Sequence, residues 1–399
     1  MDASAKVSAG PPARPVVGLV LTGGGARSAY QVGVLRALAE ILPRARNPFQ
    51  IIVGTSAGAV AACVLAGQAH AWRHAVAGLV RVWSQFRTNQ VFYVDTAHMV
   101  RSGLHWTLAL LSGGLVLAPP KSVLDNSPLR ALVGIEVDCA GIRRSIARGH
   151  LRACAICATS YTTGQSVAYF DGPEPQSEWT RVQHVGRRTE LTLDHLMASV
   201  AIPLLFPPIR LGTEYFGDGS MRQLNPLSPA IHLGADRLLI IGVRSRQAAG
   251  VGADGPPGMP TPGEVFGYML DTLFTDQVYG DLEHVMRINQ LVQAAPETRD
   301  MRHIETLMLT PSVDPSRVAA RHIDEMPRGL RALLRIVGGR PEDSGDQLAS
   351  YLTFESAYTG ELIDLGYRDA MEARSEITAF MSGERPPSVT SARGPAQAG

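Results

Sequence analysis

Residues 49–66, FQIIVGTSAGAVAACVLA, join an apolar strand, a tight turn around Ser56 and a helix of small and apolar residues. The same order occurs once upstream, where the apolar run at residues 16–21 is followed by three glycines and by apolar residues at helical spacing over residues 30–42. Two consecutive units of strand, loop and helix predict a parallel sheet covered by helices, with ligands bound at the carboxyl ends of the strands.

Apolar runs further along the chain extend this pattern. Strand-length runs occur at residues 153–159, 166–170, 209–216, 237–243 and 306–309, with mostly helical segments between them. Over residues 266–292 apolar side chains recur every three or four positions, which predicts a long amphipathic helix. The predicted fold class is therefore α/β, with a mostly parallel central sheet.

Shifts in composition predict the domain organisation. The segment after residue 246 is rich in Gly, Pro and Ala, and both ends of the chain are low in apolar residues. We expect a disordered leader at residues 1–14, a core domain at 15–246, a flexible loop at 247–263, a mostly helical extension packed on the core at 264–385, and a disordered tail at 386–399.

The composition is that of a globular protein with little net charge. Of 399 residues, 45% are hydrophobic and 18% are charged, so the chain is long enough to bury a sizeable core. A formal net charge of +1 creates no field that attracts nucleic acid or an anionic bilayer, and we expect no nucleic-acid partner. Residues 1–15 lack the apolar segment of a signal peptide, and the four scattered cysteines fit a reducing compartment. We therefore expect a cytoplasmic protein and leave peripheral contact with a membrane open.

Two further segments each have two interpretations. Residues 104–118, LHWTLALLSGGLVLA, form an apolar run shorter than the roughly 20 residues of a spanning helix, so we expect no transmembrane span. The run is either a buried helix pair or a cap over the site that contacts lipid. Cys154 and Cys157 have the CxxC spacing of zinc and redox sites, but they lie in a strand-forming run without a second ligand pair. Strand packing is the preferred interpretation, and no metal site is predicted.

The turn at residues 54–58, GTSAG, has the GxSxG pattern of a nucleophile elbow. An elbow forces its serine into a strained backbone conformation, so small residues must stand two positions before and after it, and Gly54 and Gly58 meet that need. The Ser56 oxygen would then lie at a helix N-terminus, where backbone N–H groups favour developing negative charge. Ser56 is the candidate nucleophile.

The upstream glycines, Gly23, Gly24 and Gly25, predict a second part of the site. Successive glycines after a strand leave N–H groups uncovered by side chains, which suits a backbone oxyanion hole. Arg27 either adds charge there or holds the loop through a structural ion pair. A dinucleotide-binding loop is the competing interpretation, but it needs an acidic residue at the end of the second strand, where this chain has Val-Gly-Thr-Ser.

A serine nucleophile requires a base, and the best candidate is Asp218. It follows an apolar strand and is flanked by glycines, so a tight loop can present the carboxylate, although Gly-Asp-Gly is also an ordinary hairpin turn. As a base it should have a pKa raised by apolar surroundings. The alternative is an α/β-hydrolase with a histidine base, but Ser56 follows only the second strand, earlier than in that fold. The histidines that follow Asp218 are His232, His284, His303 and His322.

Together these residues resemble the patatin-like phospholipase family. That family's pattern is a GGGxRG loop, then GxSxG, then a distal DGA or DGG, and this chain has GGGARS, GTSAG and DGS in the same order. The flanking segments GARSAYQVGVLRAL, ASVAIPLLFPPIRL and NPLSPAIHLGADRLLIIGV are similar too, so the resemblance runs from about Val16 to Val243 and more weakly toward Ala370. Ser28 and Ser220 depart from the pattern; both are small, and we expect a local adjustment without loss of activity.

The resemblance implies a three-layer α/β/α fold with a Ser56–Asp218 dyad and no histidine. It also implies that the three glycines, with Arg27 beside them, form the oxyanion loop, that no metal or organic cofactor is needed, and that the substrates are phospholipids or related acyl lipids. We therefore expect a serine lipid acyl hydrolase of the phospholipase A or lysophospholipase type, working through an acyl-enzyme. Two alternatives stay open: an esterase or thioesterase on soluble acyl esters, and a catalytically silent lipid-binding protein.

Overall fold

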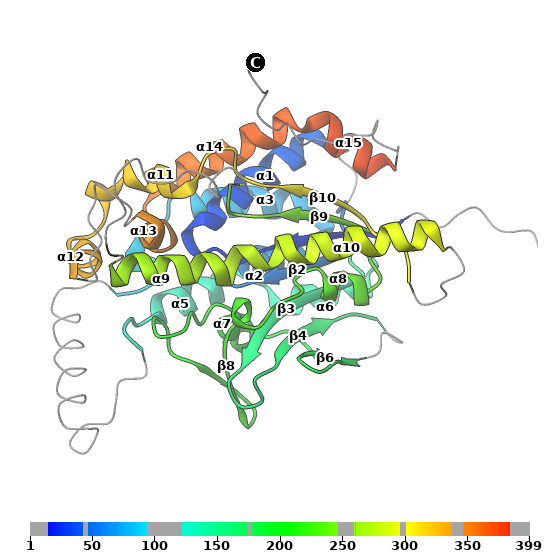
Figure 1. The fold of residues 1–399 in the computed structure, drawn as a ribbon, viewed down its shortest axis with the longest axis horizontal. Helices are drawn as coiled ribbons and strands as arrows, with labels where there is room; N and C mark the ends of the chain where they lie inside the picture. The colour runs from blue at the N-terminus through cyan, green and yellow to red at the C-terminus, as the bar shows by residue number, and fades with distance from the viewer. Residues whose placement is uncertain are drawn as a thin grey trace, which may run out of the picture.

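A computed structural model describes residues 15–42, 47–93, 122–173, 178–245, 259, 261–295, 301–336 and 346–383. Parallel strands form the centre of its sheet (Figure 1): β1 (Val17–Leu21), β2 (Ile51–Thr55), β3 (Ala153–Ser160), β9 (Arg237–Ile241) and β10 (Glu305–Leu309). Their order is β10-β9-β1-β2-β3, and each neighbouring pair is parallel. Because β1 and β2 are adjacent and parallel, the loops that follow them lie at the same edge of the sheet.

The other side of the sheet is largely antiparallel. β4 (Ser166–Asp171) pairs antiparallel with β3, β6 (His184–Arg188) runs parallel to β4, and the short β5 (Trp179–Thr180) follows β6 in the order. β7 (Ile209–Leu211) and β8 (Glu214–Asp218) form a hairpin, and β8 pairs antiparallel with β3. The single strand predicted over residues 209–216 is therefore wrong: Gly212 adopts a φ of 61°, and the chain turns back there.

Helices cover both faces of the sheet because the strand side chains alternate between two cores. Leu19 and Leu21 join a core formed with α1 (Ala29–Ile41), α2 (Ala57–Gly67), α3 (Trp72–Trp83) and α14 (Ser356–Glu372). Val20 points the other way, into a core covered by α8 (Ser228–His232) and α10 (Gln277–Ala294). The predicted α/β fold, with a mostly parallel sheet between helical layers, is confirmed. Other helices are α5 (Ser127–Glu136), α6 (Cys139–Ala147), α7 (Leu193–Ser199), α11 (Pro315–Ala320), α12 (Arg328–Ile336), α13 (Asp346–Leu352) and α15 (Arg374–Ser382).

The long helix predicted over residues 266–292 is present with one local change. α9 (Pro262–Asp271) begins with a reciprocal capping box between Thr261 and Glu264, and a π-helical turn at residues 272–276 joins it to α10 (Figure 1). Such turns widen a helix locally and displace one side chain. Here the turn contains Phe274, which packs against Gly23 at the end of β1.

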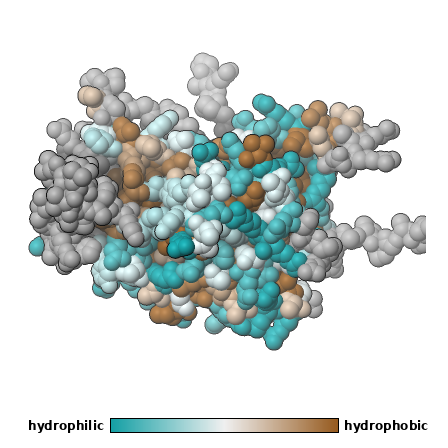
Figure 2. All heavy atoms as spheres, turned by 90° about the horizontal axis from the view of Figure 1, so that it is seen from below, coloured by the Kyte–Doolittle hydropathy of each residue, from teal (hydrophilic) through white to brown (hydrophobic). Residues whose placement is uncertain are grey.

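Several predicted segments lie outside the described residues. They are the apolar run at 104–118, the leader at 1–14, most of the loop at 247–263 and the tail at 386–399. Among the helices of the described ranges, none is long and apolar enough to span a bilayer. Seen from below, hydrophobic side chains lie in separate patches among hydrophilic ones (Figure 2).

Candidate active site

Ser56 stands at the sharp turn between β2 and α2. Its φ of 53° and ψ of −129° fall outside the regions that L-residues ordinarily occupy, so the surrounding structure must hold this conformation. The predicted elbow glycines allow the close passage: a Cβ on Gly54 would lie 2.5 Å from the Cα of Ala59, and one on Gly58 would lie 2.4 Å from the carbonyl oxygen of Leu21. The serine is 2% exposed and directly precedes the first residue of α2.

A second serine, Ser199 at the end of α7, anchors the elbow. The backbone N–H of Ser56 donates to Ser199 Oγ at 2.9 Å, and that hydroxyl donates to the carbonyl oxygen of Cys157 at 2.7 Å. Ser199 is fully buried, so both bonds are shielded from water. The sequence patterns do not predict this role, because Ser199 stands in the sequence only as a lone serine in the apolar run LMASVAIPLLF.

Asp218 lies at the end of β8 and reaches the elbow across β3. Thr55, the residue before Ser56, pairs with Cys157 of β3, and the next residue of β3, Ala158, pairs with Asp218. Ser56 and Asp218 therefore lie near each other at this end of β3. The loop after Asp218 continues toward β2, because a Cβ on Gly219 would lie 3.0 Å from Cγ2 of Thr55. The structure thus brings the two candidate dyad residues to one place.

The Asp218 carboxyl is buried, with 1% exposure, and is only partly satisfied. Oδ1 accepts a hydrogen bond from the Ser220 backbone N–H at 2.9 Å, while Oδ2 has no hydrogen-bond partner of ordinary geometry among the described residues. Burial raises the pKa of Asp218 to about 6, against the opposing effect of the Ser56 hydroxyl and of Ser220. A carboxylate with this pKa is ionised at neutral pH and still basic enough to take a proton.

The three glycines lie beside this pair at the end of β1. Gly25 has a φ of 53° and passes so close to α13 that a Cβ would lie 2.5 Å from the carbonyl oxygen of Tyr351. A Cβ on Gly23 would meet Phe274 and Ser220 Oγ, both at 2.6 Å, and one on Gly24 would meet Val243 at 2.6 Å. Side chains are therefore excluded from the whole loop, and Gly25 lines the same cavity as Ser56.

Arg27 is held in a buried ion pair on the C-terminal side of this loop. Nη1 donates to Asp271 Oδ1 at 2.8 Å and to the Tyr351 hydroxyl at 3.1 Å, and Nε donates to Ser350 Oγ at 2.7 Å. Burial alone would lower the pKa of Arg27, but the Coulombic effects of Tyr351 and Asp271 outweigh it and leave the pKa raised. Arg27 is not among the described residues that line the cavity at Ser56. Of the two roles considered for Arg27, this geometry supports the structural ion pair.

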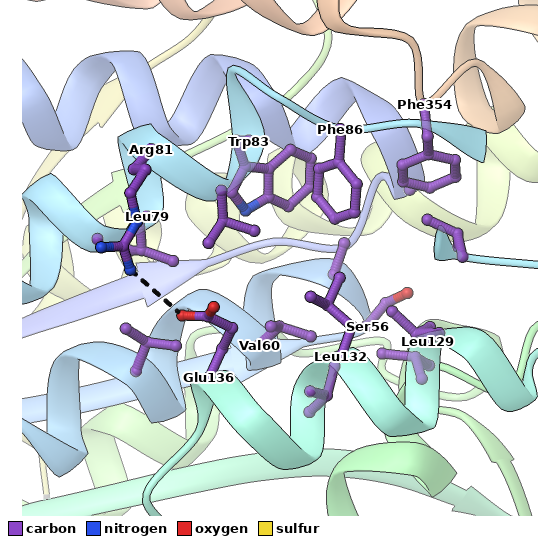
Figure 3. Close-up of a pocket in the computed structure, with 18 of the residues that line it drawn as sticks. Ser56, Val60, Leu79, Arg81, Trp83, Phe86, Leu129, Leu132, Glu136 and Phe354 are labelled. Atoms are coloured by element: carbon purple, nitrogen blue, oxygen red, sulfur yellow. Dashed lines mark ion pairs between the residues drawn. The ribbon is translucent and has the colours of Figure 1, made fainter. Parts of the chain in front are cut away.

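An apolar cavity of about 310 Å³ extends from Ser56 between α2, α3 and α5. Its apolar lining includes Val60, Leu79, Trp83, Phe86, Leu129, Leu132 and Phe354. Figure 3 shows Ser56 beside Leu129, with Phe86 and Phe354 in the facing row of side chains and the Arg81–Glu136 ion pair at the opposite end of the side chains drawn. A cavity of this volume and lining suits an apolar group attached to the atom that Ser56 would attack.

The histidines of the competing α/β-hydrolase interpretation lie elsewhere. His232 stacks on Trp179 with ring centroids 4.8 Å apart, and His322 pairs with Glu361. Within the described ranges, the lining of the Ser56 cavity includes none of the four candidate histidines, and His74 is its one histidine.

The two thiols of the CxxC segment point to opposite faces of β3, since Cys154 and Cys157 belong to different cores. No group of three or more possible metal ligands occurs in the part of the chain that the structure describes.

The sequence model of the family described as patatin-like phospholipase matches residues 19–231, more than half of the chain, and the chain therefore belongs to that family. A comparison with curated proteins gave no match.

Three solved structures illustrate the structural similarity. Human GIVD cytosolic phospholipase A2 is 15% identical with a TM-score of 0.44, and the match covers 93% of this chain and 59% of that one. VipD from Legionella pneumophila is 15% identical with a TM-score of 0.35, and the coverages are 91% and 67%. ExoU of Pseudomonas aeruginosa, in complex with SpcU, is 15% identical with a TM-score of 0.28, and the coverages are 84% and 68%. This chain thus spans about three fifths of the length of the human enzyme, and at these TM-scores the family assignment rests on the family model alone.

Proposed function

We propose that this protein hydrolyses fatty-acyl esters of phospholipids or related lipids, as a phospholipase A or lysophospholipase does, with Ser56 as nucleophile and Asp218 as base. One observation supports this most strongly: a strained, buried serine lies beside a buried carboxylate of raised pKa, at one end of an apolar cavity. Family membership supplies the substrate class.

In the proposed mechanism, Asp218 takes the proton of Ser56 as the hydroxyl oxygen attacks the ester carbonyl carbon. The oxyanion forms beside the glycine loop, where backbone N–H groups can stabilise it, and its collapse expels the alcohol, which receives the proton from Asp218. Water then attacks the acyl-enzyme while Asp218 takes its proton, the bond between the acyl carbon and Ser56 Oγ breaks, and Oγ receives the proton from Asp218 as the fatty acid leaves. Because the N–H of Ser56 is already donated to Ser199, the oxyanion donors of this scheme come from other residues, chiefly the loop at Gly23–Gly25.

The acid–base chemistry needs no metal and no organic cofactor, since the serine supplies the nucleophile and the carboxylate moves the proton. Cytoplasmic location and peripheral membrane contact stay predictions from the sequence, and residues 104–118 stay a candidate lipid-contacting cap.

The test is the release of free fatty acid from mixed phospholipid vesicles. Ser56→Ala and Asp218→Asn should each abolish release, whereas Ser145→Ala and Asp171→Asn, which also alter buried polar residues, should retain it. All four variants are compared with wild type by circular dichroism. Release that survives Asp218→Asn at the wild-type rate would contradict the dyad and point to another base.

Separate measurements test the two alternative functions, an esterase on soluble esters and a silent lipid-binding protein. An esterase or thioesterase on soluble esters would show no rate increase when a substrate passes from monomers to micelles. A catalytically silent lipid-binding protein would fail to react with a fluorophosphonate at Ser56.

A further inference from the structure

The cavity at Ser56 is apolar beside the serine and charged at its other end. Beside the serine lies Leu129, which is buried, and Phe354, also buried, lines the same cavity. At the other end of the side chains drawn in Figure 3, Arg81 and Glu136 face each other with 3.9 Å between Nη2 and Oε2, and their side chains are 67% and 31% exposed. Among the described residues that line the cavity, the polar ones besides Ser56 are Gln68, His74, Arg81 and Glu136.

Helix geometry gives the distance between the two ends. Leu129, Leu132, Val133 and Glu136 form one stripe of α5 along the cavity. At a rise of about 1.5 Å per residue, the charged pair lies about 10 Å beyond Leu129, and Gln68, twelve residues after Ser56, lies about 18 Å along α2. An extended alkyl chain advances about 1.3 Å per carbon, because C–C bonds of about 1.5 Å meet at tetrahedral angles. The apolar path therefore accommodates roughly eight to fourteen carbons before it becomes polar.

A longer chain would gain nothing from its last carbons. Beyond the pair, the end of the alkyl chain would either stay in water or cover the two charged groups. Covering them removes water from the charges and offers no new polar partner, which is unfavourable. An exposed ion pair is itself worth only about 0 to 1 kcal/mol, so the pair limits the chain by its polarity and position more than by its strength.

We propose that the Arg81–Glu136 pair sets the length of acyl chain that the cavity binds. The inference rests on the proposed function, in that the occupant of the cavity is the acyl group of the substrate. Use of the pair as a phosphate site fits less well. The phosphate of a phospholipid is only a few bonds from the ester that Ser56 attacks, and Glu136 would repel an anion at that end.

Binding of neutral, uncleaved chains tests the proposal without turnover. Primary fatty amides of 6 to 16 carbons are titrated into the Ser56→Ala protein by calorimetry, below their critical micelle concentrations. Affinity should rise about fourfold per added carbon while methylenes are being buried, and then stop rising at a break between about eight and fourteen carbons.

The decisive variant replaces the pair by apolar residues in the same background. Arg81→Leu with Glu136→Leu continues the apolar wall by about one helical turn of 5.4 Å, so the break should move about four carbons toward longer chains. Leu132→Trp, within the α5 stripe, should move it toward shorter chains. The matched control is Arg143→Leu with Glu190→Leu, an exposed ion pair with 2.9 Å between its atoms that lies outside the cavity lining, and it should leave the break unchanged.

The outcomes separate the two proposals. An unchanged break in the double-leucine variant, with Leu132→Trp shifting it, would overturn the role of the pair. Affinity independent of chain length in the Ser56→Ala protein would overturn the cavity as the acyl site and the role of the pair with it. A wild-type protein that binds amides with the expected break but releases no fatty acid would overturn the proposed hydrolysis and leave the length limit supported.

Discussion

Replacing Asp218 with asparagine should stabilise this protein while abolishing its activity. Burial raises the pKa of Asp218 from 3.8 to about 6, so the folded protein holds its proton more tightly than the unfolded chain does. Keeping the carboxyl ionised in the folded state therefore costs about 3 kcal/mol once the pH exceeds the folded pKa. Below about pH 4 both states are protonated and the cost vanishes. Asparagine has the same shape, can still accept the Ser220 N–H and carries no charge, so it removes this cost.

The difference in stability between wild type and Asp218→Asn should thus be small near pH 4, grow up to about pH 6 and stay constant above it. With an unfolding entropy of about 2.1 cal/mol/K per residue, 3 kcal/mol corresponds to a rise in Tm of about 4 °C for a chain of this length. Differential scanning calorimetry of both proteins from pH 4 to 8 measures this difference in Tm. An Asp218→Asn protein that is less stable than wild type, or a gain in stability that does not change with pH, would refute the conclusion that burial raises the pKa of Asp218.

Three further predictions follow from the same geometry. The kcat/KM for a neutral ester should fall tenfold per pH unit below about 6, where Asp218 becomes protonated, and a profile that is flat down to pH 4.5 would exclude it as the base. Ser199→Ala should destabilise the protein by about 1 to 3 kcal/mol and lower kcat more than it changes KM, because the Ser56 N–H loses its buried acceptor. An unchanged kcat would show that Ser199 does not hold Ser56 in position. Arg27→Met alone should lower the free energy of unfolding, measured with urea, by about 3 to 5 kcal/mol, and adding Asp271→Asn should recover part of that loss. If the losses of the two single variants simply add in the double variant, the two residues are not coupled.

The sequence was sufficient for the parts of this fold that local patterns determine. The strand at β2, the turn at Ser56 and the helix after it follow from a contiguous run in which each small residue has a steric reason. Residues 209–216 were misassigned because their apolar character hid the turn at Gly212, which depends on one backbone angle.

The remaining features of the site depend on contacts between distant segments. The Arg27–Asp271 pair joins residues 244 positions apart, and the support of Ser56 by Ser199 spans 143. No local pattern distinguishes Ser199 from any other buried serine. The stripe on α5 that lines the cavity has the same periodicity as one that packs in a core, so only the assembled helices reveal which side chains leave space between them.

The ion pair of Arg27 also bears on when the protein becomes active as it is made. The glycine loop is synthesised before both partners of its arginine. Asp271 follows Arg27 by 244 positions, and Ser350, to which Nε donates, follows it by 323. Until those residues emerge from the ribosome, the guanidinium has neither its buried anion nor its hydroxyl partner, and Gly25 lacks the α13 backbone that it packs on. The nascent chain thus carries Ser56 and Asp218 well before the glycine loop has all the residues that hold it in place, so the proposed hydrolysis should begin only after Ser350 has been translated.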